Sequence, residues 1–165
     1  MKAHAGRAPQ DGFFLIEAMV AILIFALGIL GLVAMGGTAV SSQSDAQYRT
    51  NASSLADAIA GQIAISINRT GATPQQKEQN KWLSLPPFAH QPGGVPCAAA
   101  GNATGPGPVF NLLNQAQVML PGANPAYQQI VVDPVGSSNR VKITLCWRSP
   151  GDNAPRRHTL VTYVN

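Results

Sequence analysis

The chain has 165 residues, of which 45% are apolar and only 11% are charged, and its formal net charge is +4. This length leaves room for one small domain and not two, and the apolar content excludes a charge-rich disordered chain. A positive charge spread this thinly argues against nucleic-acid binding.

The first element along the chain is a long apolar segment. From Leu15 to Met35 the only ionisable side chain is Glu17. About 20 apolar residues span a bilayer as a helix, whereas a secretory signal has a shorter apolar core that ends in a small-residue cleavage site. Because Lys2 and Arg7 precede the segment, the positive-inside rule predicts a cytoplasmic N terminus, with the chain after Thr38 outside the membrane.

Glu17 is a carboxylate a short way inside this helix. On insertion scales such a group costs about 2.5–3.5 kcal/mol at the helix centre and less near the interface. Either Glu17 reaches the headgroups, or a cation compensates it. If a protease separates Gly12 from Phe13, the new α-amino group of Phe13 is such a cation, in the same chain or on a neighbouring subunit.

The residues Gly12-Phe13-Phe14-Leu15-Ile16-Glu17 resemble the prepilin signal Gly-Phe-Thr-Leu-Ile-Glu of type IV pilins and type II secretion pseudopilins, with Phe14 where threonine is commoner. The resemblance implies that residues 1–12 are a leader, removed by the prepilin peptidase, and that 13–37 form the transmembrane helix. It further implies N-methylation of Phe13 and a role for Glu17 and Phe13 in docking subunits into a filament. Many major pilins have a proline in this helix. The present helix has none, which favours a minor pilin or a pseudopilin.

Beyond the apolar segment the sequence becomes polar but keeps a helical period. Its apolar residues recur three or four apart, at Ala52, Leu55, Ala56, Ile59, Ile63 and Ile67. This stripe predicts that 38–71 continue the helix as an amphipathic segment packed on a globular head, with Gly71 and Pro74 ending it. A Ser/Gln-rich linker is the alternative.

Proline and glycine dominate the next stretch, and we expect irregular surface structure from Gly71 to Gly107. Its apolar residues are expected to dock it onto the sheet or the helix. These are Trp82, Leu83, Leu85 and Phe88.

The C-terminal part predicts a short helix and three strands. The helix runs from Pro108 to Val118 and ends at Leu120-Pro121-Gly122. The strands are Tyr127–Asp133, Arg140–Arg148 and Arg156–Val164. In the middle strand Val141, Ile143, Leu145 and Trp147 alternate with Lys142, Thr144, Cys146 and Arg148, so we expect one face on the long helix and the other in solvent.

These elements predict an α+β fold, in which a long N-terminal helix packs on a small antiparallel sheet in a head formed by residues 72–165. Pilins have this architecture. The C-terminal region, with the terminal strands that hold Cys146-Trp147-Arg148, resembles the PilV type of type IV pilus modification protein.

Cys97 and Cys146 both lie beyond the apolar segment, where an exported domain meets an oxidising compartment, and a disulfide between them is expected. It would close a loop of about 50 residues and stabilise the head by about 4 kcal/mol in the chain-entropy model. Two free thiols, or a redox pair, are the alternatives.

No catalytic or metal-binding pattern is found. The three histidines are scattered, and the sequence contains no phosphate-binding loop, nucleophile elbow or paired carboxylates. We therefore expect no enzyme, cofactor, metal or small-molecule substrate. Arg148, Arg156 and Arg157 form a possible basic patch with Lys142 and His158, which would either bind DNA or serve as a solvated strand face.

The expected function is that of a minor pilin in type IV pilus assembly or initiation. Its partners would be the inner membrane, the prepilin peptidase, the major pilin and other minor pilins. The head would lie in the periplasm, or in the pilus after assembly. The alternatives are a type II secretion pseudopilin, a pilus-associated adhesin or DNA-binding subunit, and an ordinary signal-anchored protein that is not processed at Gly12.

Overall fold

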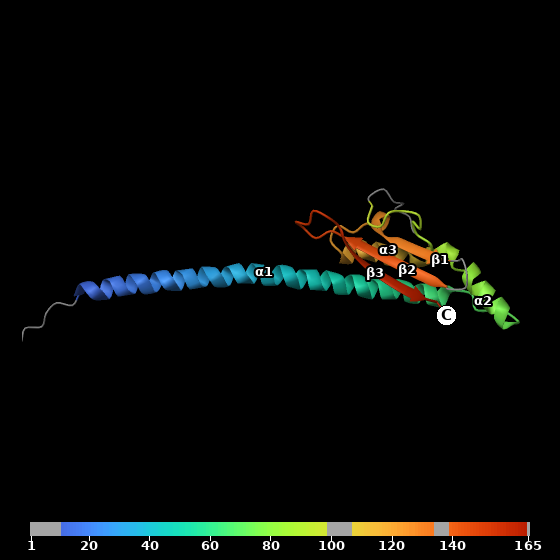
Figure 1. Ribbon diagram of the computed structural model, residues 1–165, viewed down its shortest axis with the longest axis horizontal. Coiled ribbons are helices and arrows are strands. Elements are labelled where there is room, and N and C mark those ends of the chain that lie inside the picture. Colours follow the sequence, from blue (N-terminus) through green and yellow to red (C-terminus); the bar gives the residue numbers. More distant parts are fainter. Residues whose placement is uncertain (1–10, 99–106, 134–138, 165) are drawn as a thin grey trace, which may run out of the picture. The chain divides into compact units, whose positions relative to one another are not determined.

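The structure is a computed structural model that describes residues 11–98, 107–133 and 139–164 (Figure 1). Most of the predicted leader, residues 1–10, lies outside the described residues. The chain divides into two compact units, Met1–Ser44 and Asp45–Asn165, and the fold of each is described separately below.

The first unit consists of the N-terminal part of helix α1, which runs from Asp11 to Ser66. Alanine, leucine and methionine are strong helix formers, and no proline interrupts the segment. Every side chain from Phe14 to Gln43 is exposed, and partial burial begins at Ser44. The apolar side chains here therefore have no packing partner in the described chain.

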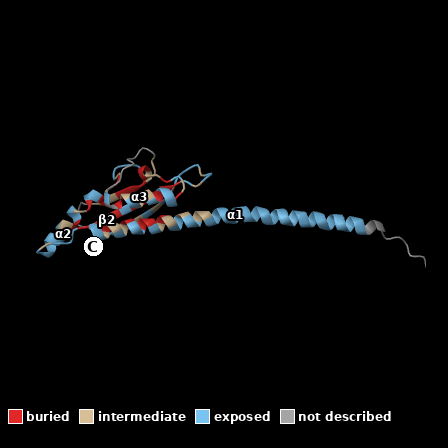
Figure 2. Cartoon of the chain, turned by 180° about the vertical axis from the view of Figure 1, so that it is seen from behind, coloured by how far each residue is buried: buried red, intermediate tan, exposed pale blue. Residues whose placement is uncertain are grey.

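The second unit begins with the remainder of α1, and here one stripe of the helix is buried. Ala52, Ala56, Ile59 and Ile63 are fully covered, while Ile65, on the other side of the helix, is 76% exposed. Figure 2 shows the red, buried residues of α1 confined to this part. The predicted amphipathic helix is confirmed, and the linker alternative is wrong.

The helix ends at Ser66, five residues before the predicted stop at Gly71. Asn68 explains the difference, since its side-chain Oδ1 accepts hydrogen bonds from the backbone N and the hydroxyl of Thr70, at 2.9 and 2.7 Å. Such a local turn competes with helix. Gly71 serves a close approach instead, because a Cβ there would lie 2.8 Å from the backbone N of Lys77.

The expectation of irregular structure after Gly71 is wrong for ten residues, which form helix α2, Pro74–Leu83. Thr73 caps its N terminus by accepting a hydrogen bond from the backbone N of Gln76 at 3.2 Å. Pro74 occupies the first turn, where proline is favoured. The Thr-Pro pair therefore begins a helix, whereas the sequence analysis used Pro74 only as the end of the preceding one.

The apolar residues of this stretch do not all dock onto the head. Leu85 and Phe88 are buried, the latter in the 3-10 turn η1, Pro86–Phe88. Trp82 and Leu83 are 38% and 58% exposed, so the expectation is wrong for these two. Both residues lie at the C-terminal end of α2 and are exposed to solvent.

The C-terminal region forms helix α3, Gly107–Met119, the 3-10 turn η2, Pro125–Tyr127, and a three-stranded antiparallel sheet. The strands are β1, Gln129–Asp133, β2, Arg140–Trp147, and β3, Arg156–Tyr163, in the order β1-β2-β3. Ile143 of β2 faces Ile130 and Leu160 on its two neighbours. Buried residues of α1, α3 and the sheet share one hydrophobic core, which confirms the α+β fold.

The outer face of β2 is not wholly in solvent, contrary to the expected alternation. Val141, Ile143, Leu145 and Trp147 are buried as predicted, but Thr144 and Cys146 on the opposite face are 1% and 0% exposed. The chain before Cys97 covers this end of the outer face, and the disulfide holds it there. On that face of β2, only Arg140 and Lys142 are exposed to solvent.

Candidate functional site

Helix α1 contains a segment long and apolar enough to cross a membrane. The most apolar 18-residue window of its Phe14–Ser66 part has a mean hydropathy of 2.8, and no residue of that window is buried. A fully exposed apolar helix is unfavourable in water and favourable in hydrocarbon, because every backbone group is already satisfied within the helix. The first unit is therefore a candidate single membrane span.

The predicted processing residues lie at the start of this helix. Gly12 and Phe13 are helical in their backbone, and Glu17 follows Phe13 by one turn. Residues four apart share a helix face, so Glu17 lies one turn after Phe13 on the same face of α1. Within the described part of the chain Glu17 is exposed and has no ion pair.

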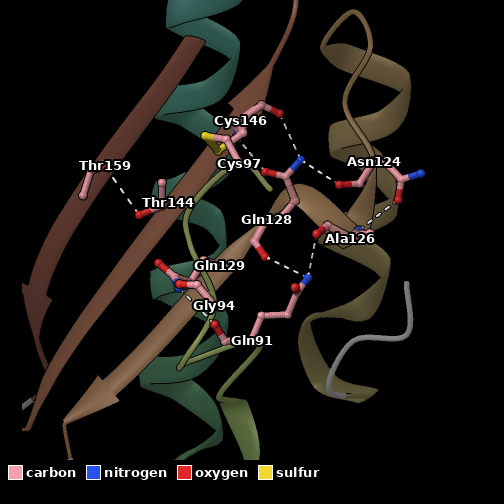
Figure 3. Close-up of a disulfide and its surroundings, with 10 residues drawn as sticks. All are labelled: Gln91, Gly94, Cys97, Asn124, Ala126, Gln128, Gln129, Thr144, Cys146 and Thr159. Carbon is pink, nitrogen blue, oxygen red and sulfur yellow. Dashed lines mark hydrogen bonds between the residues drawn. A yellow bond between two sulfur atoms is a disulfide. The ribbon is translucent and has the colours of Figure 1, made fainter. Parts of the chain in front are cut away.

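The disulfide between Cys97 and Cys146 is present, which confirms the prediction and excludes the free-thiol alternative for this structure. The two Cα atoms are 5.4 Å apart across a sequence separation of 49 residues. The bond joins the loop that follows η1 to Cys146, the second-last residue of β2 (Figure 3).

A buried glutamine that the sequence analysis missed fixes the position of Cys146. Gln128 is 1% exposed, and its side-chain amide pairs with the backbone of Cys146 as a strand would. Oε1 accepts from the Cys146 N at 2.7 Å, while Nε2 donates to the Cys146 O at 3.0 Å (Figure 3). The amide thus extends the ladder beyond the N-terminal end of β1, which begins at Gln129. A glutamine just before a strand gives no sequence signal for this role.

Two further side-chain amides tie the loop before Cys97 to the sheet. Gln129 Nε2 donates to the carbonyls of Gln91 and Gly94, at 3.0 and 2.7 Å. Gln91 in turn donates to the Ala126 carbonyl at 2.9 Å. These bonds close the loop over Thr144 and Cys146 independently of the disulfide (Figure 3).

The possible basic patch does not form as one surface. Arg156 pairs with the carboxylates of Asp45 and Asp152, and only 32% of its side chain is exposed. Arg157, the next residue on β3, is directed to the opposite face, where it lies across from Cys146. Arg148 and Arg157 remain exposed and make no ion pair with another described residue.

Arg156 instead joins three segments of the second unit. It bonds Asp45 on α1, while its Nε and Nη2 donate to the two carboxylate oxygens of Asp152 at 2.7 and 3.1 Å. Asp45 also pairs with Arg49 at 3.2 Å. The network fastens the connection between β2 and β3 to the first residue of this unit.

In the described ranges, no group of three or more His, Cys, Asp or Glu side chains is arranged to hold a metal ion. His90 is buried and its Nε2 lies 2.9 Å from the Pro125 carbonyl, which is a structural contact between the loop and η2.

Comparison with known proteins finds no match: no family model, no curated protein and no solved structure is significantly similar to this chain.

Proposed function

We propose that the protein is a minor pilin that takes part in the assembly or initiation of a type IV pilus. It would be made as a precursor, cut between Gly12 and Phe13, and held in the inner membrane by α1 until it enters a filament. The head would lie on the periplasmic side. Its role is assembly and display, without catalysis.

One observation carries the proposal, namely the prepilin-like sequence at the start of an exposed apolar helix. Glu17 is the only charge between residue 13 and residue 44, and it lies one turn from Phe13 on the same face. Cleavage between Gly12 and Phe13 would turn the backbone N of Phe13 into an ammonium group. A carboxylate in lipid needs such a partner, and an ordinary anchor helix needs neither group.

The head adds support of a coarser kind. A long helix whose second part packs on a small antiparallel sheet is the architecture expected for a pilin, and the same helix supplies both the membrane segment and the core stripe. The engagement of Arg156 by Asp45 and Asp152 weakens the DNA-binding alternative. A type II secretion pseudopilin would share all of these features and differ in its partners.

The test is the intact mass and N-terminal sequence of the protein recovered from membranes of a host with an active prepilin peptidase. We expect a chain that begins at N-methylated Phe13. Gly12→Ala should retain residues 1–12. Gly28→Ala is the matched control and should be processed normally, because a Cβ at Gly28 meets no atom within 4 Å.

A wild-type chain that keeps residues 1–12 in this host would contradict the proposal and favour an ordinary signal-anchored protein. A second variant addresses docking. Glu17→Gln keeps the shape of the side chain and removes its charge, so we expect normal cleavage but loss of the protein from sheared pili. Recovery of the variant in pili at the wild-type level would exclude the docking role of the Glu17 charge.

A further inference from the structure

A pocket of about 460 Å³ lies in the head where β2 ends and the chain turns toward β3. Its wall includes Pro121, Tyr127, Trp147, Arg148 and Ser149. This volume falls within the range of small-molecule sites, about 300–1,000 Å³. Nothing in the membrane helix or the pilin proposal requires such a pocket.

Two polar atoms of the lining residues have no hydrogen-bond partner among the residues that the structure describes. Trp147 is 1% exposed, and its indole Nε1 makes no hydrogen bond, nor does the buried hydroxyl of Ser149. Buried donors without acceptors are costly, and proteins seldom keep them without a reason. Two of them, both on residues that line one pocket, indicate that a bound group completes this site.

The charges around the pocket define that group. Asp152 is part of the lining, but both of its carboxylate oxygens accept hydrogen bonds from Arg156. Arg148 has no ion pair with any described residue and is exposed. The lining residues therefore supply one guanidinium without an ion pair and the indole N–H of Trp147, which is covered from solvent. Both groups only donate, so the ligand must supply an anionic acceptor.

The remaining lining is apolar, with prolines at 121, 150 and 155 and the ring of Tyr127. Gly122, with a φ of +60°, brings the turn against β2, since a Cβ there would lie 3.1 Å from the Arg148 carbonyl. These walls suit an apolar body behind the acceptor group. They do not suit a bare inorganic anion.

We propose that this pocket binds a carboxylate carried on a short apolar body, about the size of a dipeptide. Arg148 pairs with the carboxylate, and Ser149 and the Trp147 indole donate hydrogen bonds to it. Both donor atoms are covered from solvent in the free chain, so binding includes a small shift of the turn 149–155. At Gly151, whose φ is +91°, an added Cβ would meet no atom within 4 Å, so the turn is not packed against another segment at this residue.

The chain offers its own spectroscopic control, because it has two tryptophans and only Trp147 lines the pocket. The full chain is labelled with ¹⁵N-tryptophan in detergent micelles and titrated with N-acetyl-alanyl-phenylalanine. We expect the Trp147 indole resonance to shift downfield and that of Trp82 to stay in place. The C-terminal amide of the same probe lacks the charge and should bind at least tenfold more weakly.

Two sources of the carboxylate are distinguished by a second titration with 4-phenylbutyrate. Tighter binding of the peptide acid indicates a chain terminus, and tighter binding of phenylbutyrate indicates a free aromatic or fatty acid. Either result supports the site. No movement of the Trp147 resonance with either acid at millimolar concentration, or equal movement with acid and amide, overturns the proposal.

Variants separate binding from folding. Arg148→Gln should weaken binding of the peptide acid about tenfold, as expected for loss of a charged hydrogen bond, and should leave its amide unaffected. Arg157→Gln is the matched control, since it removes an exposed arginine on the neighbouring strand outside the pocket. Equal affinity of the acid for both variants and for the wild type would contradict the role of Arg148.

Discussion

The two parts of α1 share one helix but face different surroundings. From Phe14 to Gln43 the side chains are exposed and overwhelmingly apolar in the first twenty positions, whereas after Asp45 one narrow stripe is buried and the rest is polar. Apolar exposure is favourable only in lipid. A buried stripe in a polar helix is favourable only against a folded head. The first part is therefore expected to depend on a membrane for its stability, and the second part depends on the head.

The disulfide gives the largest test of this difference. Replacing both Cys97 and Cys146 by alanine should lower the free energy of unfolding of the head by about 4 kcal/mol, because the open loop has more conformational freedom in the unfolded chain. Amide hydrogen exchange of the full chain in nanodiscs should show lost protection after Asp45 and unchanged protection from Phe14 to Gln43. Equal loss in both parts would contradict their independence.

Matched isoleucines sharpen the comparison within the second part. Ile63→Ala removes a fully buried side chain and should cost about 2–5 kcal/mol of head stability. Ile65→Ala, at a position 76% exposed, should change it by less than about 0.5 kcal/mol. Denaturant unfolding followed by Trp147 fluorescence measures both. Similar costs for the two variants would mean that the stripe is not the packing face.

A charge placed in the first part tests the membrane assignment. Leu23→Arg should cost about 2.5–3.5 kcal/mol of insertion free energy and shift the protein from the carbonate-resistant membrane fraction to the soluble fraction. Ser41→Arg adds the same charge beyond the apolar core and should leave the protein in the membrane. Retention of both variants would indicate that residues 15–35 do not span the bilayer.

The smallest loss of stability is expected from breaking the ion pairs that connect Arg156 of β3 to Asp45, where the second part of α1 begins. Arg156→Ala breaks the ion pairs with Asp45 and Asp152 and should destabilise the head by about 1 kcal/mol, since the arginine is partly exposed. Arg157→Ala, one residue later on the open face, should have no measurable effect. The difference between the two should shrink in 1 M salt, and a salt-independent difference would argue for packing instead of charge.

Much of this fold was predictable from local patterns. Strand β2 was placed with its last residue one position too long, and the stripe on α1 was identified residue by residue, because burial on one face imposes a period of 2 or 3.6 on the sequence. Helix α2 was missed. Its sequence is polar all round and has no apolar period, so the Thr73 cap was its only local signal.

The sequence by itself determined the candidate membrane segment, the signal-like residues from Gly12 to Glu17, and which two cysteines pair, because each depends on composition or on a short stretch of chain. Tertiary structure alone decided the rest. Gln128 meets Cys146, Arg156 meets Asp45, and Tyr127 joins Trp147 in a pocket wall only after the sheet has formed. Contacts between residues far apart in the chain leave no periodic trace in the sequence, so the pairing of the Gln128 amide with Cys146, the ion-pair network of Arg156 and the pocket appear only in the folded head.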